Sequence, residues 1–118
     1  MKILVVDDSS TMRRIIKNTL NRMNLTNIIE AVDGEDGIKQ LESEKGINII
    51  ITNMPNIDGL TFVKYIRKNK KYDDISIIMI TTGGGKTEVI TALKASVNNF
   101  IKPFTPNVLM KKLQVVLG

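Results

Sequence analysis

Short, almost wholly apolar runs recur along the chain, and a segment with apolar residues at helical spacing follows each of them. The runs at residues 3–6, 47–52 and 77–81 are typical of strands that are buried on both faces of a sheet. Residues 28–29 and 100–101 form two shorter apolar runs. The pattern therefore predicts five strands.

The segments between these runs have the period of amphipathic helices. Thr105 and Pro106 predict where the last helix begins, because Thr is a favoured N-cap and Pro suits the first helical position. Turn formers predict a turn at residues 33–34 and loops at residues 54–59 and 83–85. The apolar positions predict helices over residues 12–23, 38–41, 60–66, 89–97 and 109–117.

Strand and helix alternate five times, which predicts an α/β fold with a doubly wound parallel sheet and helices on both faces. The chain has no internal repeat, low-complexity tract or linker, so we expect a single domain over residues 1–118. In such sheets, ligands bind beyond the carboxyl ends of the strands. The residues that directly follow each strand are therefore the candidates for a functional site.

The composition narrows the chemistry of that site. The chain has no Cys and no His, which excludes disulfides, thiolate metal sites and histidine acid–base chemistry. Carboxylates, hydroxyls, lysines and the backbone must carry any activity. No apolar run approaches the length of a membrane span, and the N-terminal run is a strand and not a secretory signal. We therefore expect a cytoplasmic protein without a membrane partner.

The formal net charge of +5 raises the question of a nucleic-acid partner. The basic residues are spread over several predicted helices and do not form one groove-sized stripe, so we interpret them as solvated helix faces and expect no nucleic-acid partner. They are Arg13, Arg14, Lys17, Lys64, Arg67, Lys68, Lys70, Lys71, Lys111 and Lys112.

Two adjacent carboxylates, Asp7 and Asp8, follow the first strand. Such a pair is costly unless it is solvated or neutralised, and Mg²⁺ typically takes one or two carboxylates and completes its shell with water and phosphate oxygens. The other interpretation is that Asp8, Ser9 or Ser10 only caps the following helix. The motif alone leaves both interpretations open.

The fourth and fifth strands lead into Thr81-Thr82 and Lys102-Pro103. A hydroxyl and an ammonium group at the edge that holds two carboxylates make a phosphoryl-binding set. Gly85-Lys86-Thr87 looks like the end of a P-loop, but that pattern needs a glycine where Ile80 stands, so we reject it.

The whole chain resembles the CheY-type chemotaxis response regulators of the receiver domain family. The resemblance implies a flavodoxin-like five-stranded sheet of order 2-1-3-4-5, a phosphoryl switch that is not an enzyme, and Mg²⁺ as cofactor. The motifs that carry it are residues 5–14 (VVDDSSTMRR), 53–59 (NMPNIDG), 81–82 (TT), 89–95 (VITALKA) and 102–106 (KPFTP).

The resemblance also implies a role for each matching residue. Asp8 would bind Mg²⁺ directly, Asp7 mainly through water, and Asn53 through its backbone carbonyl. Thr81 would be the switch hydroxyl and Phe100 the switch aromatic. Lys102 would sense the phosphoryl group, and the peptide bond before Pro103 would be cis.

The chain departs from the family at the phosphoacceptor. The family has Asp and one more residue before Asn-Met-Pro, whereas Thr52 here runs straight into Asn53. A match without a gap puts Ile51 in the Asp position, but the flanking residues fit the family better with two residues missing between Thr52 and Asn53. A third is missing between Ile101 and Lys102, which would put Phe100 and Lys102 on the same face of the strand unless the strand ends early.

Three explanations of the missing acceptor stay open. The chain is a receiver without a phosphorylation site, or the record has lost residues from an ordinary receiver, or Asp58 substitutes, although Asp58-Gly59 is an ordinary turn pair. The first two fit the sequence equally well, and the third fits it least.

Two functions are therefore open. The leading hypothesis is a two-component phosphorelay switch: a CheA-type sensor histidine kinase donates the phosphoryl group, and the face made by the fourth helix, fifth strand and fifth helix then binds the flagellar motor switch protein. A phosphatase is a further expected partner, and we expect a monomer. The alternative is a phosphorylation-incompetent receiver that acts as a constitutive protein-binding module. Gly83, where many relatives have a larger or acidic side chain, would affect the rate of dephosphorylation.

Overall fold

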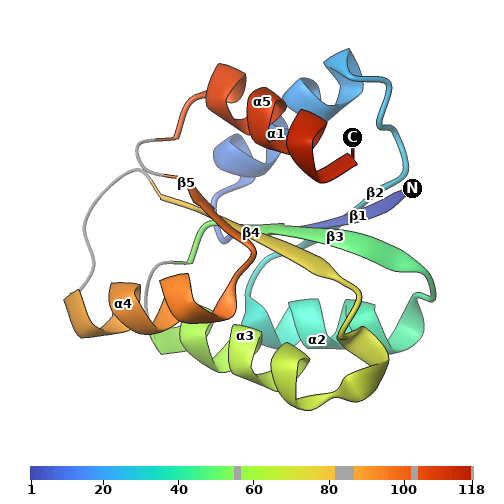
Figure 1. Cartoon of the computed structure of the whole chain (residues 1–118). Helices are drawn as coiled ribbons and strands as arrows, with labels where there is room; N and C mark the ends of the chain where they lie inside the picture. The colour runs from blue at the N-terminus through green and yellow to red at the C-terminus, as the bar shows by residue number, and fades with distance from the viewer. Residues whose placement is uncertain (55–56, 82–86, 102–103, 118) are drawn as a thin grey trace.

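The computed structural model describes residues 1–54, 57–81, 87–101 and 104–117, and within them the strands form one parallel sheet (Figure 1). The strands lie in the order β2-β1-β3-β4-β5, and each is parallel to its neighbours. This confirms the predicted fold class and strand order. The strands are β1 (Lys2–Val6), β2 (Ile28–Ala31), β3 (Ile47–Thr52), β4 (Ser76–Ile80) and β5 (Asn99–Ile101).

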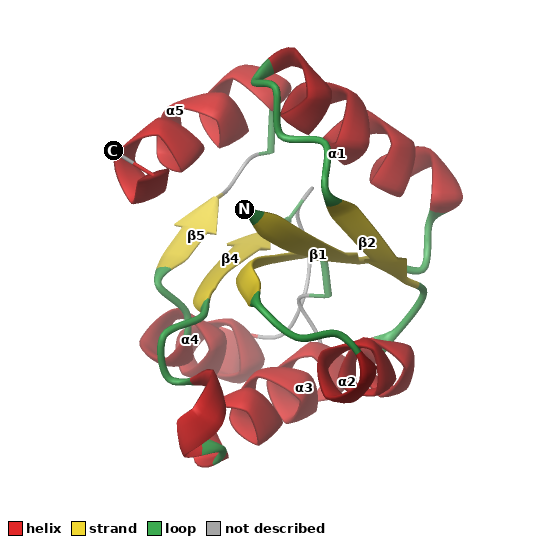
Figure 2. Ribbon diagram, turned by 90° about the vertical axis from the view of Figure 1, so that its right-hand side faces the viewer, coloured by secondary structure: helices red, strands yellow, loops and turns green. Residues whose placement is uncertain are grey.

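Helices cover both faces of the sheet (Figures 1 and 2). One face carries α1 (Ser10–Arg22) and α5 (Pro106–Leu117). The other carries α2 (Gly34–Ser43), α3 (Ile57–Lys68) and α4 (Thr87–Ser96). A 3₁₀ turn that the sequence did not predict, η1 (Lys70–Tyr72), lies between α3 and β4.

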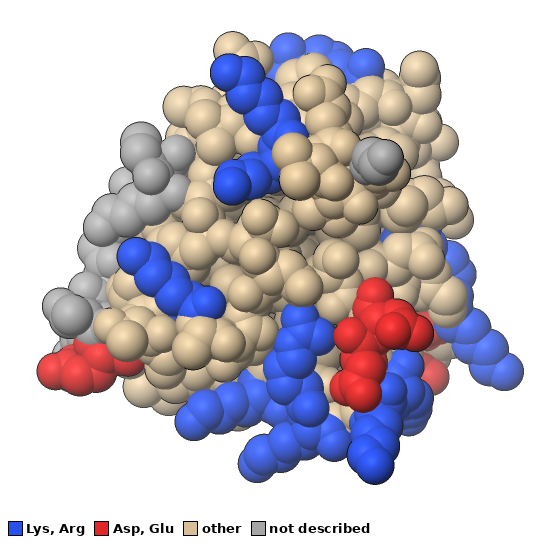
Figure 3. Space-filling view, in the orientation of Figure 1, with Lys and Arg blue, Asp and Glu red and all other residues tan. Residues whose placement is uncertain are grey.

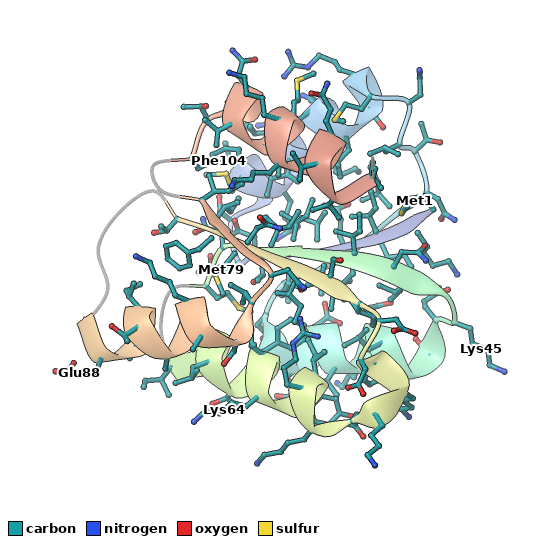
Figure 4. The ribbon with its side chains drawn as sticks, viewed as in Figure 1. Met1, Lys45, Lys64, Met79, Glu88 and Phe104 are labelled. Carbon is teal, nitrogen blue, oxygen red and sulfur yellow. The ribbon has the colours of Figure 1, made fainter. Side chains whose placement is uncertain are left out.

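Alternate residues of each strand contribute to two separate apolar clusters. In β3, Ile49 and Ile51 belong to the cluster under α1 and α5, whereas Ile50 belongs to the cluster under α2, α3 and α4. In Figure 4, Met79 lies on the α4 side of the sheet and Phe104 on the α5 side. The near-continuous apolar runs of the sequence arise because the inner strands are buried on both faces.

Side-chain caps decide where three helices begin. The Ser9 Oγ accepts a hydrogen bond from the Met12 N–H at 3.1 Å, so Ser9 caps α1. Thr105 caps α5 in the same way, which confirms the predicted start of that helix. The predicted turn at residues 33–34 lies one residue earlier, at residues 32–33, because the Asp33 carboxylate accepts from the Asp36 N–H and caps α2, which begins at Gly34.

Several boundaries differ from the prediction. The predicted loop at residues 54–59 is too long, since α3 begins at Ile57. The predicted strand at residues 77–81 lies one residue earlier, so Thr81 is the first residue beyond β4. β5 ends at Ile101, and the predictions for residues 83–85 and for Lys102 and Pro103 fall outside the described residues.

Basic side chains lie over the upper helices, over α4 and, in greater number, along the lower edge by α3 (Figure 3). This spread supports the prediction that they do not form one stripe. Arg13, Lys17 and Arg67 are not simply solvated, however, and Lys17 donates to Glu30. The Arg13 guanidinium donates to the Asp7 backbone carbonyl and to Glu30, and that of Arg67 donates to three acceptors near the start of β4. Within the described residues, no helix has both the length and the apolar character of a membrane span.

Candidate functional site

Three of the predicted site residues, Asp7, Asp8 and Asn53, directly follow β1 and β3 at the carboxyl edge of the sheet. The register pairs Val6 of β1 with Thr52 of β3, so Asp7 and Asn53 leave neighbouring strands at the same level. The Asn53 N–H donates to the Val6 carbonyl at 3.2 Å, which extends the pairing of the two strands by one residue. The edge therefore brings the acidic pair and Asn53 together.

Asp7 is the buried member of the acidic pair. Asp7 is 1% exposed, and both of its carboxylate oxygens accept hydrogen bonds. Oδ1 accepts from the Ser9 N–H at 2.9 Å, and Oδ2 accepts from the Asn53 Nδ2 at 3.2 Å. Burial raises the pKa of Asp7, the two donors act in the opposite direction, and the neighbouring Asp8 adds to the increase. The charge of Asp7 is thus stabilised mainly by hydrogen bonds.

Asp8 is exposed to solvent, and it does not cap the helix, because Ser9 does so. Of the two interpretations of the Asp7-Asp8 motif, a helix cap and a cation site, the cap therefore involves neither aspartate. Ser9 caps the helix, and the two carboxylates are left at the edge of the sheet with contrasting environments.

Asn53 directly follows β3, and its carboxamide lies against the carboxylate of Asp7. The resemblance suggested a role for its backbone carbonyl, whereas the structure gives its side chain a contact with the acidic pair. From Ile47 to Ile57 the sequence contains no Asp or Glu. The chain therefore presents a carboxamide, and no carboxylate, at the end of β3.

Thr81 is fully buried, and its backbone joins two segments. Its N–H donates to the Ile101 carbonyl at 3.1 Å, and its carbonyl accepts from the Phe104 N–H at 3.1 Å. Thr81 is therefore bonded directly to the end of β5 and to the chain that enters α5. Lys102, the predicted phosphate-sensing residue, lies between these two contacts in the sequence but outside the described residues.

Phe100, the predicted switch aromatic, is half-buried in β5 and packs against the cluster under α2, α3 and α4. The Lys94 ammonium of α4 lies 5.2 Å from the centre of its ring, within the range of a cation–π contact. The ring therefore links β5 to α4.

Asp58 is not brought to the site. It lies exposed in the first turn of α3 and lines a cavity of about 360 Å³ with Asp33, Gly34, Glu35 and Phe62, and Asp7 is not among the residues of this cavity. This position supports the view that Asp58 does not replace the missing acceptor.

The edge fits a hard cation only in part. Asp7 and Asp8 supply two carboxylates, which is the number that Mg²⁺ usually takes when phosphate oxygens complete its shell. Within the described residues, however, no three acidic, His or Cys side chains lie together. The group beside Asp7 is the Asn53 amide, which acts there as a donor. Asp7 and Asp8 are the residues that would hold Mg²⁺, and the metal would supply positive charge near a phosphoryl group.

Two features of the site escaped the sequence analysis. One is the contact between the Arg13 guanidinium and the Asp7 carbonyl, for which the only available signal was an arginine in the first turn of a helix that follows the acidic pair. The other is Thr52, whose buried hydroxyl has no hydrogen-bond partner within the described residues. No sequence signal marks that hydroxyl.

Sequence comparisons find relatives along almost the whole chain. Residues 3–114 match the family model of the response regulator receiver domain. The chain is 57% identical to the chemotaxis protein CheY1 of Helicobacter pylori, over all of this chain and 98% of that protein. It is 58% identical to the chemotaxis protein CheY homolog of Campylobacter jejuni, over all of this chain and 93% of that protein.

Both alignments extend over 121 positions, three more than the 118 residues of this chain. The difference equals the number of residues that the sequence analysis expects to be missing after Thr52 and before Lys102.

Comparison with solved structures also finds a chemotaxis response regulator. The structure of the Vibrio cholerae chemotaxis protein CheY4 superposes with a TM-score of 0.79 at 33% identity, over 98% of this chain and 97% of that one. The family match covers nearly the whole chain, and the relatives agree in sequence, in length and in fold. The chain therefore belongs to the response regulator receiver domain family, as a CheY-type chemotaxis response regulator of a two-component system.

Proposed function

We propose that the 118-residue chain acts as one receiver domain that takes the signal of a CheA-type sensor histidine kinase and passes it to the flagellar motor switch protein. The output surface would be the face formed by α4, β5 and α5. The proposal rests on two grounds. The chain belongs to the chemotaxis response regulators, and hydrogen bonds connect the carboxyl edge of the sheet to that face.

The observation that carries the proposal is the backbone of Thr81. It is bonded on one side to Ile101 in β5 and on the other to Phe104, two residues before α5 begins. A phosphoryl group that draws the Thr81 hydroxyl toward the edge would therefore displace both segments of the output face. Phe100, a residue of β5 whose ring contacts Lys94 of α4, would move with β5.

In the phosphoryl switch, an acceptor carboxylate takes the phosphoryl group from the phosphohistidine of the kinase. Asp7 and Asp8 would hold Mg²⁺, and Lys102 would pair with the phosphoryl oxygens. This function needs an acceptor carboxylate at the end of β3, which the printed sequence does not contain.

A second function is favoured by the Asn53 contact. With a carboxamide at the end of β3, the chain would be a phosphorylation-incompetent receiver that binds its partner constitutively. Both functions predict a monomer in the cytoplasm, without nucleic acid or membrane as partner. The phosphoryl switch predicts a phosphatase as a further partner.

Intact mass distinguishes the two functions. The purified protein is weighed before and after incubation with Mg²⁺ and acetyl phosphate, and its binding to a motor switch protein is measured in both states. A mass of 13.2 kDa, no added phosphoryl group and unchanged binding support the constitutive module. A mass larger by about three residues, with roughly 80 Da added on treatment, supports the phosphoryl switch. Failure to bind the motor switch protein in either state would overturn the proposed partner.

A further inference from the structure

Lysines gather on the outer side of α3 and η1, where Figure 3 shows the greater number of basic side chains. Five of the eight residues from 64 to 71 are basic, and the four lysines among them are all exposed. Lys64 and Lys68 lie one turn apart on one face of α3, and Lys64 points away from the sheet (Figure 4). We call residues 64–71 the lysine ridge.

The lysine ridge is not neutralised by the part of the chain that the structure describes, where no ion pair includes any of its lysines. Glu42 of α2 reaches α3, but its carboxylate accepts a hydrogen bond from the Tyr65 hydroxyl at 3.1 Å and not from a lysine. Like charges one helical turn apart, such as those of Lys64 and Lys68, repel each other. The ridge would therefore be stabilised by carboxylates that another molecule supplies.

A cavity of about 370 Å³ adjoins the end of the ridge, at the amino edge of the sheet. Lys71 lines it, together with residues at the start of β3 and in the segment before β4. Its apolar lining comes from buried residues of the cluster under α2, α3 and α4, which are Leu41, Ile47, Tyr72 and Ile75. The volume is at the small end of the range for binding cavities, so the cavity suits one large apolar side chain.

Two exposed aspartates follow the ridge and decide which class of anion fits it. Asp73 and Asp74 come directly after Tyr72, and Asp74 also lines the cavity. A membrane of anionic lipids or a nucleic acid is negative throughout and would be repelled by them. The ridge also offers no exposed ring on which a base could stack, since Tyr72 is buried and Tyr65 is only partly exposed. A polypeptide can place carboxylates on the lysines and keep them away from the aspartates.

We propose that the lysine ridge and the adjoining cavity form a docking surface for an acidic segment of another protein. The segment lays carboxylates along Lys64 and Lys68 and places one apolar side chain in the cavity beside Lys71. The buried side chain supplies most of the affinity, and the charges fix the orientation and speed the encounter. No residue of this surface belongs to α4, β5 or α5, so the acidic partner and the motor switch protein can be bound at the same time.

The first test measures, by fluorescence anisotropy at low salt, the binding of a labelled peptide of glutamates with one central leucine. The ridge variant, Lys64→Glu with Lys68→Glu, should bind it about tenfold more weakly, because attraction becomes repulsion at two positions. The matched control is Arg14→Glu with Arg22→Glu, which changes the net charge equally on the exposed side of α1. Arg22 and Lys68 both lie in the last turn of their helix. The control should lose less than about threefold, through long-range attraction alone.

The second test locates the peptide by nuclear magnetic resonance of the ¹⁵N-labelled chain. The amide signals of Gly46, Ile47 and Ile75, which line the cavity, should shift when the peptide binds. A peptide with serine in place of the leucine should bind about fivefold more weakly, because it buries no apolar side chain. Equal losses of affinity in the ridge variant and the control, or shifts confined to residues outside the ridge and the cavity, would overturn the proposal.

Other occupants are tested with the same proteins. Tighter binding to vesicles of phosphatidylserine and phosphatidylcholine, or to duplex DNA, than to the peptide would contradict a protein partner. Self-association of the unchanged chain that the ridge variant loses would identify the occupant as a second copy, which also overturns the proposal. If circular dichroism shows that the ridge variant does not fold, Lys64→Gln with Lys68→Gln removes the charges without repulsion and should weaken peptide binding about threefold. Unchanged binding by that variant would contradict the role of the ridge.

Discussion

Thr52, the last residue of β3, carries a buried hydroxyl that has no hydrogen-bond partner among the residues that the structure describes. Its strand neighbours are Val6 and Met79, both in the apolar cluster under α2, α3 and α4. A buried hydroxyl that gives up water and gains no partner lowers stability. The methyl group of Thr52 suits this site, and its oxygen does not.

The change Thr52→Val replaces the hydroxyl with a methyl group of similar size. We expect it to raise the free energy of unfolding by about 1 kcal/mol, because an unsatisfied polar group is removed. Urea unfolding measures the difference. Thr19→Val is the matched control, since the Thr19 hydroxyl is equally buried but donates to the Ile15 carbonyl at 2.9 Å. A gain in both variants, or a loss in Thr52→Val, would contradict this explanation.

Glu30 gives the chain a small dependence on pH. Burial acts to raise the pKa of Glu30, but the hydrogen bonds and charges of Lys17 and Arg13 outweigh it, and the pKa is lowered from 4.5. A lowered pKa in the folded state stabilises the protein above the ordinary pKa, and this contribution is lost as the pH falls through the folded value.

The change Glu30→Gln should therefore lower the free energy of unfolding at pH 7. It should have no effect at an acidic pH below the lowered pKa of Glu30, where the carboxyl group is protonated in the folded state. The Glu30 side chain is 39% exposed, so solvent screening limits the loss at pH 7 to about 0.5 kcal/mol. Urea unfolding at both pH values measures it, and added salt should reduce the loss at pH 7. A loss of the same size at low pH would show that the ion pairs are not its cause.

At the scale of elements, Arg67 fastens the end of α3 to the segment between α4 and β5. Its guanidinium donates to the Ser96 and Ile75 carbonyls and to the Asn98 Oδ1, at distances from 2.8 to 3.2 Å. The same Asn98 oxygen accepts from the Ile77 N–H at 2.7 Å. The start of β4 and the end of α4 are thus held by one side chain.

We expect Arg67→Met to lower the free energy of unfolding by about 2 kcal/mol, because three acceptors lose a charged donor while the apolar stem is kept. Hydrogen exchange should also become faster at the Ile77 N–H, whose partner Asn98 loses its support. Lys68→Met, at an exposed position of the same helix, is the control and should leave both measurements almost unchanged. Equal effects of the two substitutions would show that the contacts contribute little.

The helices α2 and α3 begin earlier than predicted for one shared cause, which is that turn formers also begin helices. Asp33 reads as part of a turn, but its carboxylate caps α2. Asp58-Gly59 reads as a turn pair, but an acidic residue suits the first turn of a helix. At Gly59 a Cβ would lie 1.8 Å from the Met54 carbonyl oxygen, so the glycine serves a close approach and not a turn. Such contacts depend on the packed chain and have no local signal.

At the scale of the molecule, the sheet separates two apolar clusters that share its strands. Leu20 of α1 lies fully buried in one cluster and Val63 of α3 fully buried in the other. Because neighbouring residues of a strand belong to different clusters, neither cluster can loosen without disturbing the strands of the other. We therefore expect the chain to unfold in one cooperative transition.

The test is the pair Leu20→Ala and Val63→Ala. The first should cost about 3 kcal/mol and the second about 2 kcal/mol, from lost burial and the cavities that remain. Since the two side chains lie on opposite faces of the sheet, the losses should add to within about 0.5 kcal/mol in the double variant. Circular dichroism and the exchange of core amides should show the same transition. Two separate transitions would mean that the clusters unfold independently.

The fold was predictable because the apolar pattern repeats at the scale of whole elements, and single errors at their ends do not change it. The acidic pair was predictable for the same reason, since it follows an unmistakable strand. The contact between Asn53 and Asp7 was not. The family motif aligns Asn53 by its position before Met54 and Pro55. In the structure, Asn53 directly follows Thr52 at the end of β3 and contacts Asp7. Continuous pairing of β3 with β1 settles the position of the side chain, and only the structure shows that pairing.

The carboxamide at the end of β3 also bears on the timing of the signal. A receiver that a kinase can phosphorylate reports the recent activity of that kinase. Its output changes as fast as phosphotransfer and hydrolysis allow. A receiver with an amide at this position takes no phosphoryl group there, so its state does not depend on recent kinase activity. Its influence on a partner follows the number of copies present, so the output changes only as fast as the chain is synthesised, degraded or diluted by growth. In a cell that also contains a chargeable receiver, it would set a constant baseline by occupying a share of the common binding sites.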